Sequence, residues 1–287
     1  MTKKDNQSLP SEYQNIVDMV LESETHNMLP AGIMLYGPKE TAKNIIAAEL
    51  SSYLLQKKNT RIHPDELILE PKLGDTKIGI EDLREFITSF SSSPLVASRR
   101  VGIIRSADIL TIQSQNALLK TLEEPPQQSC MILIVDDATK ILTTIESRLT
   151  KIYISPLSQN SYQSFLNKQN ITAPPKELWS YYVGRLERTM YLQKNTDYSL
   201  ALFAKEIYQN VRTHPSRIFL YTQKNKKTDT QDLSQCIPYL IYYAHQDLSK
   251  NNKNYFSRHF LSGLLTYIAH PLNQNLQLTL ENVCLQN

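Results

Sequence analysis

An α/β fold with a parallel sheet, followed by all-helical segments, is the architecture that this 287-residue sequence predicts. Uninterrupted apolar runs at 101–104 and 131–135 are typical of strands buried on both faces of a parallel sheet. Between these runs, Leu118, Leu119 and Leu122 fall on one face of a helix. A strand, a helix and a second strand in this order form a βαβ unit.

Further strands are predicted at 32–36, 67–69 and 152–154, which are also short apolar runs. Helical periodicity precedes and separates them. It begins with an amphipathic segment at 11–28, in which Met19 lies on the apolar face.

The last third of the chain shows helical periodicity throughout. Its apolar positions recur near helical spacing, namely Leu202, Ile207, Val211, Ile218 and Leu220.

Composition and charge exclude several classes of protein. The formal net charge of +3 gives no case for nucleic-acid binding through bulk charge. No apolar run approaches the roughly 20 residues of a membrane span. Cys130, Cys236 and Cys284 form no CxxC pair and no metal-ligand cluster, so we expect buried, reduced thiols. Because the start of the sequence lacks an apolar signal region, we expect a soluble cytoplasmic protein.

Two motifs carry a resemblance to a known family. Residues 116–126 (NALLKTLEEPP) resemble a sequence of bacterial clamp-loader subunits of the AAA+ superfamily. Residues 144–149 (TIESRL) resemble the Ser-Arg-Cys motif of these subunits, with Leu149 where cysteine is usual. The segments 78–86 and 275–281 resemble other parts of the same family.

This resemblance implies three domains. They are an AAA+ α/β domain with a degenerate P-loop over 1–155, a small helical lid over 156–200 and an all-α collar domain over 201–287. The family often carries a four-cysteine zinc module, but residues 56–66 contain no cysteine and His63 stands alone. No metal site is therefore expected.

Residues 37–44 (GPKETAKN) lie in the strand–loop–helix setting of a P-loop, G-x-x-x-x-G-K-[ST]. Gly37 and Lys43 match, but Ala42 replaces the second glycine and Asn44 replaces the hydroxyl that ligates Mg²⁺. A Cβ at Ala42 strains a loop that must aim its N–H groups at phosphates. We therefore expect no bound ATP, with Gly37 and Lys43 as vestigial nucleotide-binding residues. Retention of a phosphate by Lys43 is the alternative.

The acidic pair with which the family hydrolyses ATP is also missing. It should follow the first of the two buried strands, where Arg105 and Ser106 stand instead. A cation repels Mg²⁺, and neither residue can act as a base. Asp108 is expected to serve structure. Asp137, after the next strand, is interpreted as the cap of a helix over 139–145, with a metal ligand as the alternative.

Four arginines have competing interpretations. By the resemblance, Arg148 is an arginine finger that acts in trans on the nucleotide of a neighbouring subunit. The alternative is a surface arginine at a helix end, where it favours the helix dipole. Arg188 matches an arginine that can sense nucleotide in the family, but we expect a structural role. Arg99 and Arg100 precede a strand and are expected at a solvated edge, with a DNA-backbone or partner contact as the alternative.

The resemblance as a whole implies a non-catalytic, delta-prime-type subunit of the DNA polymerase III clamp loader. Such a subunit assembles with gamma or tau and delta subunits, and the assembly contacts the sliding clamp and primer-template DNA. The alternatives are an ATP-hydrolysing gamma- or tau-type subunit, a stand-alone P-loop kinase and a regulatory AAA+ ATPase of transcription.

Overall fold

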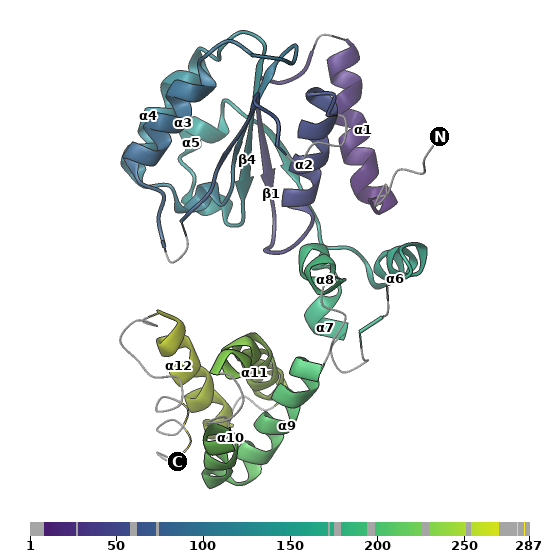
Figure 1. The fold of residues 1–287 in the computed structure, drawn as a ribbon, viewed down its shortest axis with the longest axis vertical. Helices are drawn as coiled ribbons and strands as arrows, with labels where there is room; N and C mark the ends of the chain where they lie inside the picture. The colour runs from purple at the N-terminus through teal and green to yellow at the C-terminus, as the bar shows by residue number, and fades with distance from the viewer. Residues whose placement is uncertain are drawn as a thin grey trace. The chain divides into compact units, whose positions relative to one another are not determined.

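The computed structural model describes residues 9–26, 28–57, 62–72, 75–171, 173–174, 179–193, 199–224, 230–250 and 254–269, with residues 280 and 284. The chain forms two compact units, residues 1–194 and 195–287. The α/β part and the helices that follow it are coloured by residue number in Figure 1.

A five-stranded sheet forms the centre of the first unit. Its strands are β1 Gly32–Tyr36, β2 Glu66–Leu69, β3 Arg100–Ile104, β4 Ser129–Val135 and β5 Thr150–Tyr153. They lie in the order β2-β3-β4-β1-β5, and each neighbouring pair is parallel. The inner strands β1, β3 and β4 are almost entirely buried, which explains their uninterrupted apolar sequences.

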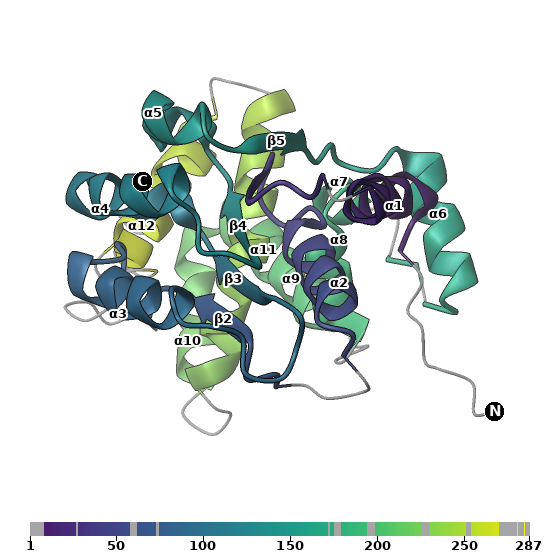
Figure 2. The same cartoon turned by 90° about the horizontal axis from the view of Figure 1, so that it is seen from above.

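Helices cover both faces of this sheet, as Figures 1 and 2 show. α1 Ser11–Thr25 and α2 Lys43–Leu54 lie on one side, and α3 Ile80–Phe90, α4 Ile112–Glu123 and α5 Thr143–Glu146 lie on the other. Two 3-10 turns, η1 Ala107–Ile109 and η2 Ala138–Lys140, follow β3 and β4. The predicted fold, a parallel sheet flanked by helices and followed by helical segments, is confirmed.

The core between the sheet and α3 is packed tightly around one glycine. Phe86 and Phe90 of α3 stack with 6.0 Å between their ring centroids. A Cβ at Gly102 of β3 would lie 2.9 Å or less from both rings. The glycine therefore allows these two rings to lie directly against the strand.

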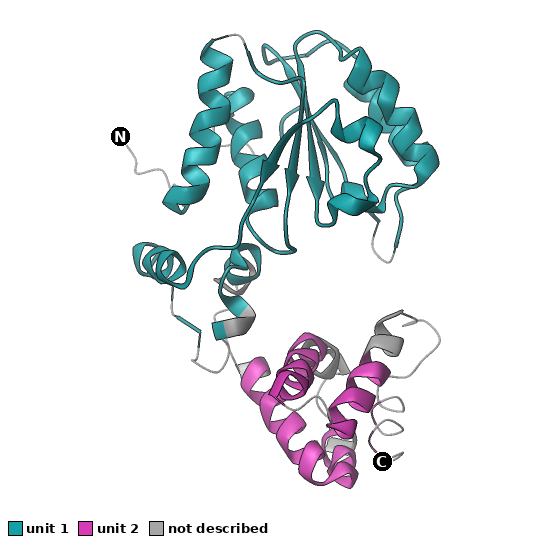
Figure 3. Ribbon diagram, turned by 180° about the vertical axis from the view of Figure 1, so that it is seen from behind, with its two compact units in different colours: residues 1–194 teal, residues 195–287 magenta. Residues whose placement is uncertain are grey.

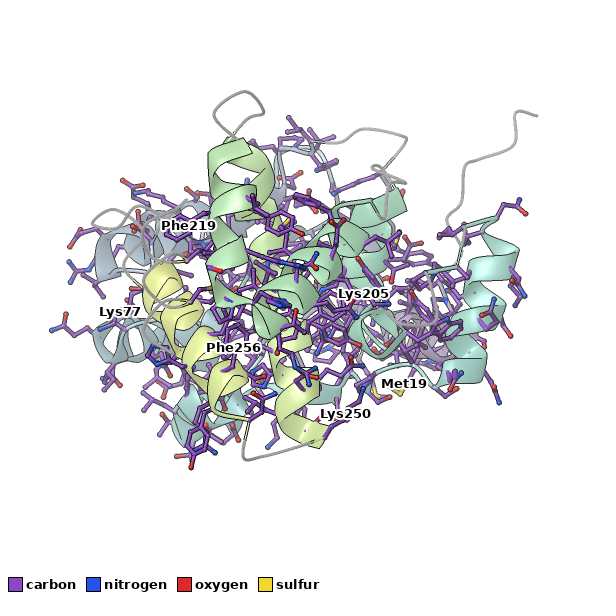
Figure 4. All side chains as sticks on the ribbon, turned by 90° about the horizontal axis from the view of Figure 1, so that it is seen from below. Met19, Lys77, Lys205, Phe219, Lys250 and Phe256 are labelled. Atoms are coloured by element: carbon purple, nitrogen blue, oxygen red, sulfur yellow. The ribbon has the colours of Figure 1, made fainter. Side chains whose placement is uncertain are left out.

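Helix α1 packs through a narrower face than the sequence predicts. Tyr13, Val17 and Val20 are buried at spacings of four and three residues. The prediction for Met19, which is labelled in Figure 4, is wrong, because its side chain is 55% exposed. The Tyr13 hydroxyl donates a hydrogen bond to the carbonyl oxygen of Ser155 at 2.7 Å. The helix is thereby tied to the segment that leaves the sheet.

The prediction of a solvated edge at Arg99 and Arg100 is also wrong. Arg99 pairs with Glu24 of α1 at 2.8 Å, and Arg100 is buried against Asp65 at 3.2 Å. Asp65 also accepts hydrogen bonds from the three backbone N–H groups of 95–97. Burial raises the pKa of the Asp65 carboxyl, but these donors and the Arg100 guanidinium outweigh it and lower the pKa from 3.8 to about 2.

Three further helices, α6 Gln159–Lys168, α7 Trp179–Tyr182 and α8 Leu186–Gln193, complete the first unit. These are the helices of the predicted lid, and Figure 3 shows them within the same compact unit as the sheet. Tyr162 joins them. Its ring meets Trp179 edge-on with 6.0 Å between centroids, and its hydroxyl lies 2.7 Å from that of Thr189.

The second unit is helical in its described part, with α9 Ser199–Thr213, η4 Pro215–Arg217, α10 Ile218–Lys224, α11 Thr230–Lys250 and α12 Tyr255–Ala269. Tyr208 lies in its core, with ring centroids 5.6 Å from Phe260 and 6.3 Å from Phe256, which Figure 4 labels.

Two of the apolar positions that recur near helical spacing, Leu202 and Leu220, are 47% and 60% exposed. The other three of these positions, Ile207, Val211 and Ile218, are buried. The tail segment 275–281 lies outside the described residues, apart from Leu280.

None of the helices in the described part of the chain is long and apolar enough to span a membrane. Across the same residues, no group of three or more His, Cys, Asp or Glu side chains is arranged to hold a metal ion. Cys130, Cys236 and Cys284 are buried thiols, as predicted. Burial raises the pKa of Cys130 and Cys284 to about 12.

Candidate functional site

The predicted P-loop segment, residues 37–42, connects β1 to α2 at the carboxyl edge of the sheet. Gly37 has a φ of +148°, and a Cβ there would collide with the carbonyl oxygen of Ile154. Glu40 also lies in the left-handed region, with a φ of 60°. Gly37 is therefore required by the turn itself, whether or not a nucleotide binds.

The ammonium group of Lys43 points back into this loop, and the residue is 1% exposed. Its Nζ donates hydrogen bonds to the carbonyl oxygens of Gly37, at 2.8 Å, and Pro38, and it lies 3.3 Å from Thr41 Oγ1. It also pairs with Asp136, at the end of β4, at 2.9 Å. An ammonium has three N–H donors, so these four acceptors leave none for a phosphate.

A carboxylate from α8 lies at the amino end of α2. Ala42 is the N-cap residue, and it makes no side-chain capping hydrogen bond. Instead, the backbone N–H of Asn44 donates to Glu187 Oε1 at 2.7 Å, and Asn44 Nδ2 donates to Glu187 Oε2 at 2.9 Å. Glu187 thus supplies the cap that Ala42 lacks.

No sequence motif points to Glu187. It lies 143 residues from Asn44 in the chain, and its own motif drew attention to Arg188 instead. The missing N-cap at Ala42 was the available signal, because an uncapped buried helix end requires a partner from elsewhere.

Three charged groups gather at this edge of the sheet. The pKa of Glu187 is raised, chiefly because the side chain is buried. The Asp136 carboxylate also raises this pKa, whereas the Asn44 donors and the Lys43 ammonium lower it. Lys43, Asp136 and Glu187 therefore interact as one cluster. They occupy the end of α2, where a P-loop would present its lysine and its N–H groups to phosphate.

Backbone contacts join the same helix, α8, to the loop. The N–H of Glu187 donates to the carbonyl oxygens of Glu40, at 3.1 Å, and Thr41, at 3.3 Å. The Arg188 guanidinium pairs with the Glu40 carboxylate. A structural role for Arg188 stays a prediction, and this ion pair supports it.

The position predicted for the acidic pair carries a cation. Arg105, directly after β3, pairs with Glu70 at 2.6 Å. Ser106 follows in the left-handed region, with a φ of 51°. Asp108 is buried and accepts a hydrogen bond from the backbone N–H of Asp136 at 3.2 Å, so it ties η1 to the end of β4.

Asp137 caps a shorter element than the sequence predicts. Its Oδ1 accepts hydrogen bonds from the backbone N–H of Thr139 at 3.1 Å and from the Thr139 hydroxyl at 2.6 Å. The hydroxyl contact is the main reason that the pKa of Asp137 is lowered. The single helix predicted over 139–145 is wrong, because the 3-10 turn η2 and the short helix α5 share this stretch.

Arg148 lies between α5 and β5, and its side chain is 34% exposed. One guanidinium nitrogen, Nη1, donates to the carbonyl oxygen of Thr144 at 2.7 Å. The other, Nη2, pairs with Glu123 Oε1 at 2.7 Å. The guanidinium therefore rests against the end of α4, within reach of solvent.

The strand register places Arg148 and the P-loop segment at opposite edges of the sheet. Thr150, which begins β5, pairs with Ile33 near the start of β1. Gly37 follows the end of β1. The four residues from Ile33 to Gly37 correspond to about 13 Å along a strand. The structure therefore brings Gly37 and Lys43 together, and it does not bring Arg148 to them.

Comparison with known proteins agrees with the fold. Residues 13–158, half of the chain, match the family described as DNA polymerase III, delta subunit. The chain belongs to this family. In this delta subunit family member, the matched region contains all five strands, the loop at 37–42 and Arg148.

Two relatives of this family member are named as subunits of DNA polymerase III. The chain is 30% identical over 107 residues to DNA polymerase III subunit delta' of Escherichia coli K12, covering 37% of this chain and 32% of that protein. It is 26% identical over 189 residues to DNA polymerase III subunit delta' of Bacillus subtilis 168, covering 65% of this chain and 53% of that protein. The aligned region is thus less than two thirds of the length of either relative.

A solved structure resembles the chain along nearly its whole length. It is that of a DNA polymerase III, gamma subunit-related protein from Thermotoga maritima, with a TM-score of 0.59 and 19% identity. The likeness covers 96% of this chain and 97% of that one, and it concerns the fold alone.

Proposed function

We propose that this member of the delta subunit family is a non-catalytic, delta-prime-type subunit of a DNA polymerase III clamp loader, which works in DNA replication. It lends the Arg148 guanidinium to the nucleotide site of a neighbouring ATPase subunit. Its partners are gamma or tau and delta subunits in a cytoplasmic hetero-oligomer, and the assembly acts on the sliding clamp and primer-template DNA. The names of the curated relatives support this assignment.

The position of Arg148 is the observation that carries the proposal. The residue lies at the amino edge of the sheet, whereas the loop at 37–42 lies at the carboxyl edge. A guanidinium side chain cannot cross the sheet to its own loop. If Arg148 acts on a phosphate, that phosphate belongs to another subunit.

The contacts of Arg148 also suit transfer to a phosphate. Its ion pair with Glu123 is exposed on both sides, at 34% and 49% of the side chains. Exposed pairs contribute about 0–1 kcal/mol, so exchanging this carboxylate for a γ-phosphate costs little. Arginine stays charged and can fork onto two phosphate oxygens, which a lysine cannot do.

The carboxyl edge of the sheet supports the non-catalytic part of the proposal. The Lys43 ammonium donates hydrogen bonds to the loop carbonyls and forms an ion pair with Asp136. Arg105 stands where the Mg²⁺-binding carboxylate is required, and it repels a second cation. Hydrolysis in this chain would lack both the metal ligand and the base.

The test is an Arg148→Ala variant in a clamp loader reconstituted with its partner subunits. Turnover at the site that the finger serves should fall by roughly 10³-fold or more, and the DNA-stimulated ATPase rate should fall with it. Size-exclusion chromatography should show an intact assembly. Arg148→Lys should not restore the rate, because its ammonium cannot fork onto two oxygens.

Lys151→Ala is the matched control. It removes an exposed cation from the same edge of the sheet, where Lys151 pairs with Glu146 at 3.2 Å. The control should keep the wild-type rate. A wild-type ATPase rate in the Arg148→Ala assembly would contradict the finger.

An ATP-hydrolysing gamma- or tau-type subunit is the alternative. It requires turnover by the isolated chain with Mg²⁺ present, whereas the proposal expects none above a protein-free blank. A steady rate that disappears in a Lys43→Ala variant would favour the alternative.

A further inference from the structure

The start of helix α8 makes a set of contacts with the loop at 37–42 that the role of Arg148 does not explain. We propose that Glu187 is an internal substitute for a nucleotide phosphate, which caps α2 and holds the lid closed over the P-loop position. We name these contacts the Glu187 latch; they involve Glu187, Arg188, Glu40, Thr41 and Asn44. The inference shares with the proposed function the expectation that this chain binds no ATP, and it otherwise concerns a different edge of the sheet.

The first step is the match between Glu187 and the group it replaces. The amino end of a helix in a P-loop binds an anion through its free N–H groups and its dipole. Here, one carboxylate oxygen of Glu187 accepts from the backbone N–H of Asn44 at 2.7 Å. The anion that this helix end favours is therefore supplied by the chain itself.

The second step explains the side chain of Asn44. A P-loop has Ser or Thr at this position, and its hydroxyl ligates Mg²⁺. Asn44 instead donates from Nδ2 to the second oxygen of Glu187 at 2.9 Å. An amide can donate to a carboxylate while its backbone N–H donates to the other oxygen, so Asn44 suits a carboxylate partner.

The third step is the charge balance of the closed site. Two carboxylates, Glu187 and Asp136, and one ammonium, Lys43, meet here. The helix dipole contributes roughly half of a positive charge. A triphosphate would add further negative charge to a cluster that is already compensated, so it can enter only when Glu187 leaves.

The fourth step is the attachment of the lid. The N–H of Glu187 donates to the carbonyl oxygens of Glu40 and Thr41, at 3.1 and 3.3 Å. The positive φ of Glu40, 60°, belongs to the turn that places these carbonyls, and its carboxylate pairs with Arg188. Backbone and side-chain contacts thus hold the same two lid residues against the loop.

The experiment removes the carboxylate from the isolated full-length chain, which needs no partner subunit. Inorganic tripolyphosphate is titrated calorimetrically into the wild type, Glu187→Ala and Glu187→Gln. We expect the Glu187→Ala chain to bind tripolyphosphate at least about tenfold more tightly than the wild type, because the helix end is freed. Glu187→Gln should bind it more weakly than Glu187→Ala, since its amide still covers the helix end. Glu85→Ala, which removes an exposed carboxylate from α3, should behave as the wild type.

A second readout follows the lid directly. Trp179, the single tryptophan of the chain, lies in the lid against Tyr162. Acrylamide should quench its fluorescence more strongly in Glu187→Ala than in the wild type or in Glu85→Ala. Wild-type quenching and wild-type tripolyphosphate affinity in a folded Glu187→Ala chain would overturn the latch.

A third readout covers the case in which Glu187→Ala does not fold. Hydrogen exchange of the wild type should show a protected amide at Asn44, because that N–H is bonded to Glu187. Glu187→Gln should exchange this amide several times faster, since a neutral acceptor is weaker. Exchange at Asn44 as fast as in an unstructured peptide would overturn the latch. These outcomes do not depend on Arg148, so failure of the latch and failure of the finger are distinguishable.

Discussion

The ion pair between Lys43 and Asp136 allows a test of whether the P-loop lysine has become a structural residue. The perturbations are Lys43→Met, Asp136→Asn and the double variant. Each single variant leaves one charge without its ion-pair partner at a site where the side chains are 2% and 24% exposed.

The magnitude follows from the geometry of this pair. At 2.9 Å and an effective dielectric constant of 20, the attraction is about 6 kcal/mol before desolvation. Desolvation of a buried ammonium and water near the partly exposed carboxylate cancel more than half of this attraction. We therefore expect a coupling free energy of about 2 kcal/mol, and we expect Lys43→Met alone to cost about 3–5 kcal/mol.

The assay is urea unfolding of all four proteins at pH 7, followed by far-UV circular dichroism and by Trp179 fluorescence. The matched control is the same cycle on Lys72 and Asp82, which pair at 2.7 Å but are 74% and 36% exposed. That cycle should show coupling near the limit of measurement. If the Lys43 and Asp136 variants add within about 0.5 kcal/mol, the structural interpretation of Lys43 is refuted.

Three further predictions concern stability and reactivity. Asp65→Asn should destabilise the protein at pH 7. The difference in unfolding free energy between this variant and the wild type should shrink by about 1 kcal/mol by pH 3, because a carboxyl with a folded pKa of about 2 stabilises the fold above its unfolded pKa of 3.8 and loses that contribution as the pH falls. Urea midpoints that keep a constant difference would contradict this. Gly37→Ala should cost about 1–3 kcal/mol in thermal unfolding, since alanine disfavours a φ of +148°, and an unchanged Tm would argue against it. Ellman's reagent at pH 8 should label none of Cys130, Cys236 and Cys284 in the native protein, because all three are buried and burial holds the pKa of Cys130 and Cys284 near 12; full labelling before denaturation would exclude the buried arrangement.

The sheet and its flanking helices were predictable because their signals are local. Strands such as 101–104 and 131–135 are buried on both faces, so their sequences are apolar without interruption. The helix over 112–123 ends just before two consecutive prolines, and this end can be predicted from the sequence alone. Such features need no knowledge of the rest of the chain.

The errors come from partners that are distant in the sequence. Arg100 is buried because Asp65, 35 residues earlier, neutralises it, and charge alone suggested a solvated edge. Met19 is apolar but lies beyond the face of α1 that packs on the rest of the unit. Residue type thus predicted burial correctly for the inner strands β1, β3 and β4, and wrongly at Arg100 and Met19, where ion pairing and helix rotation decide it.

The candidate site likewise has features that the sequence predicts and a feature that it does not. The departures at Ala42, Asn44 and Arg105 could be recognised in the sequence, because a fixed motif says what should stand there. What replaces the nucleotide could not be recognised. Glu187 reaches Asn44 through tertiary structure, and no motif specifies a glutamate at that point.

The bond between Asn44 and Glu187 also determines the order in which mutation can restore this site. Placing threonine at position 44 first removes the amide donor and leaves a buried carboxylate without one of its two hydrogen bonds. Removing Glu187 first uncaps α2 before any anion is available to replace it. Each of these single changes toward a standard P-loop therefore lowers the stability of the chain, because the two hydrogen bonds of Glu187 to Asn44 depend on both residues.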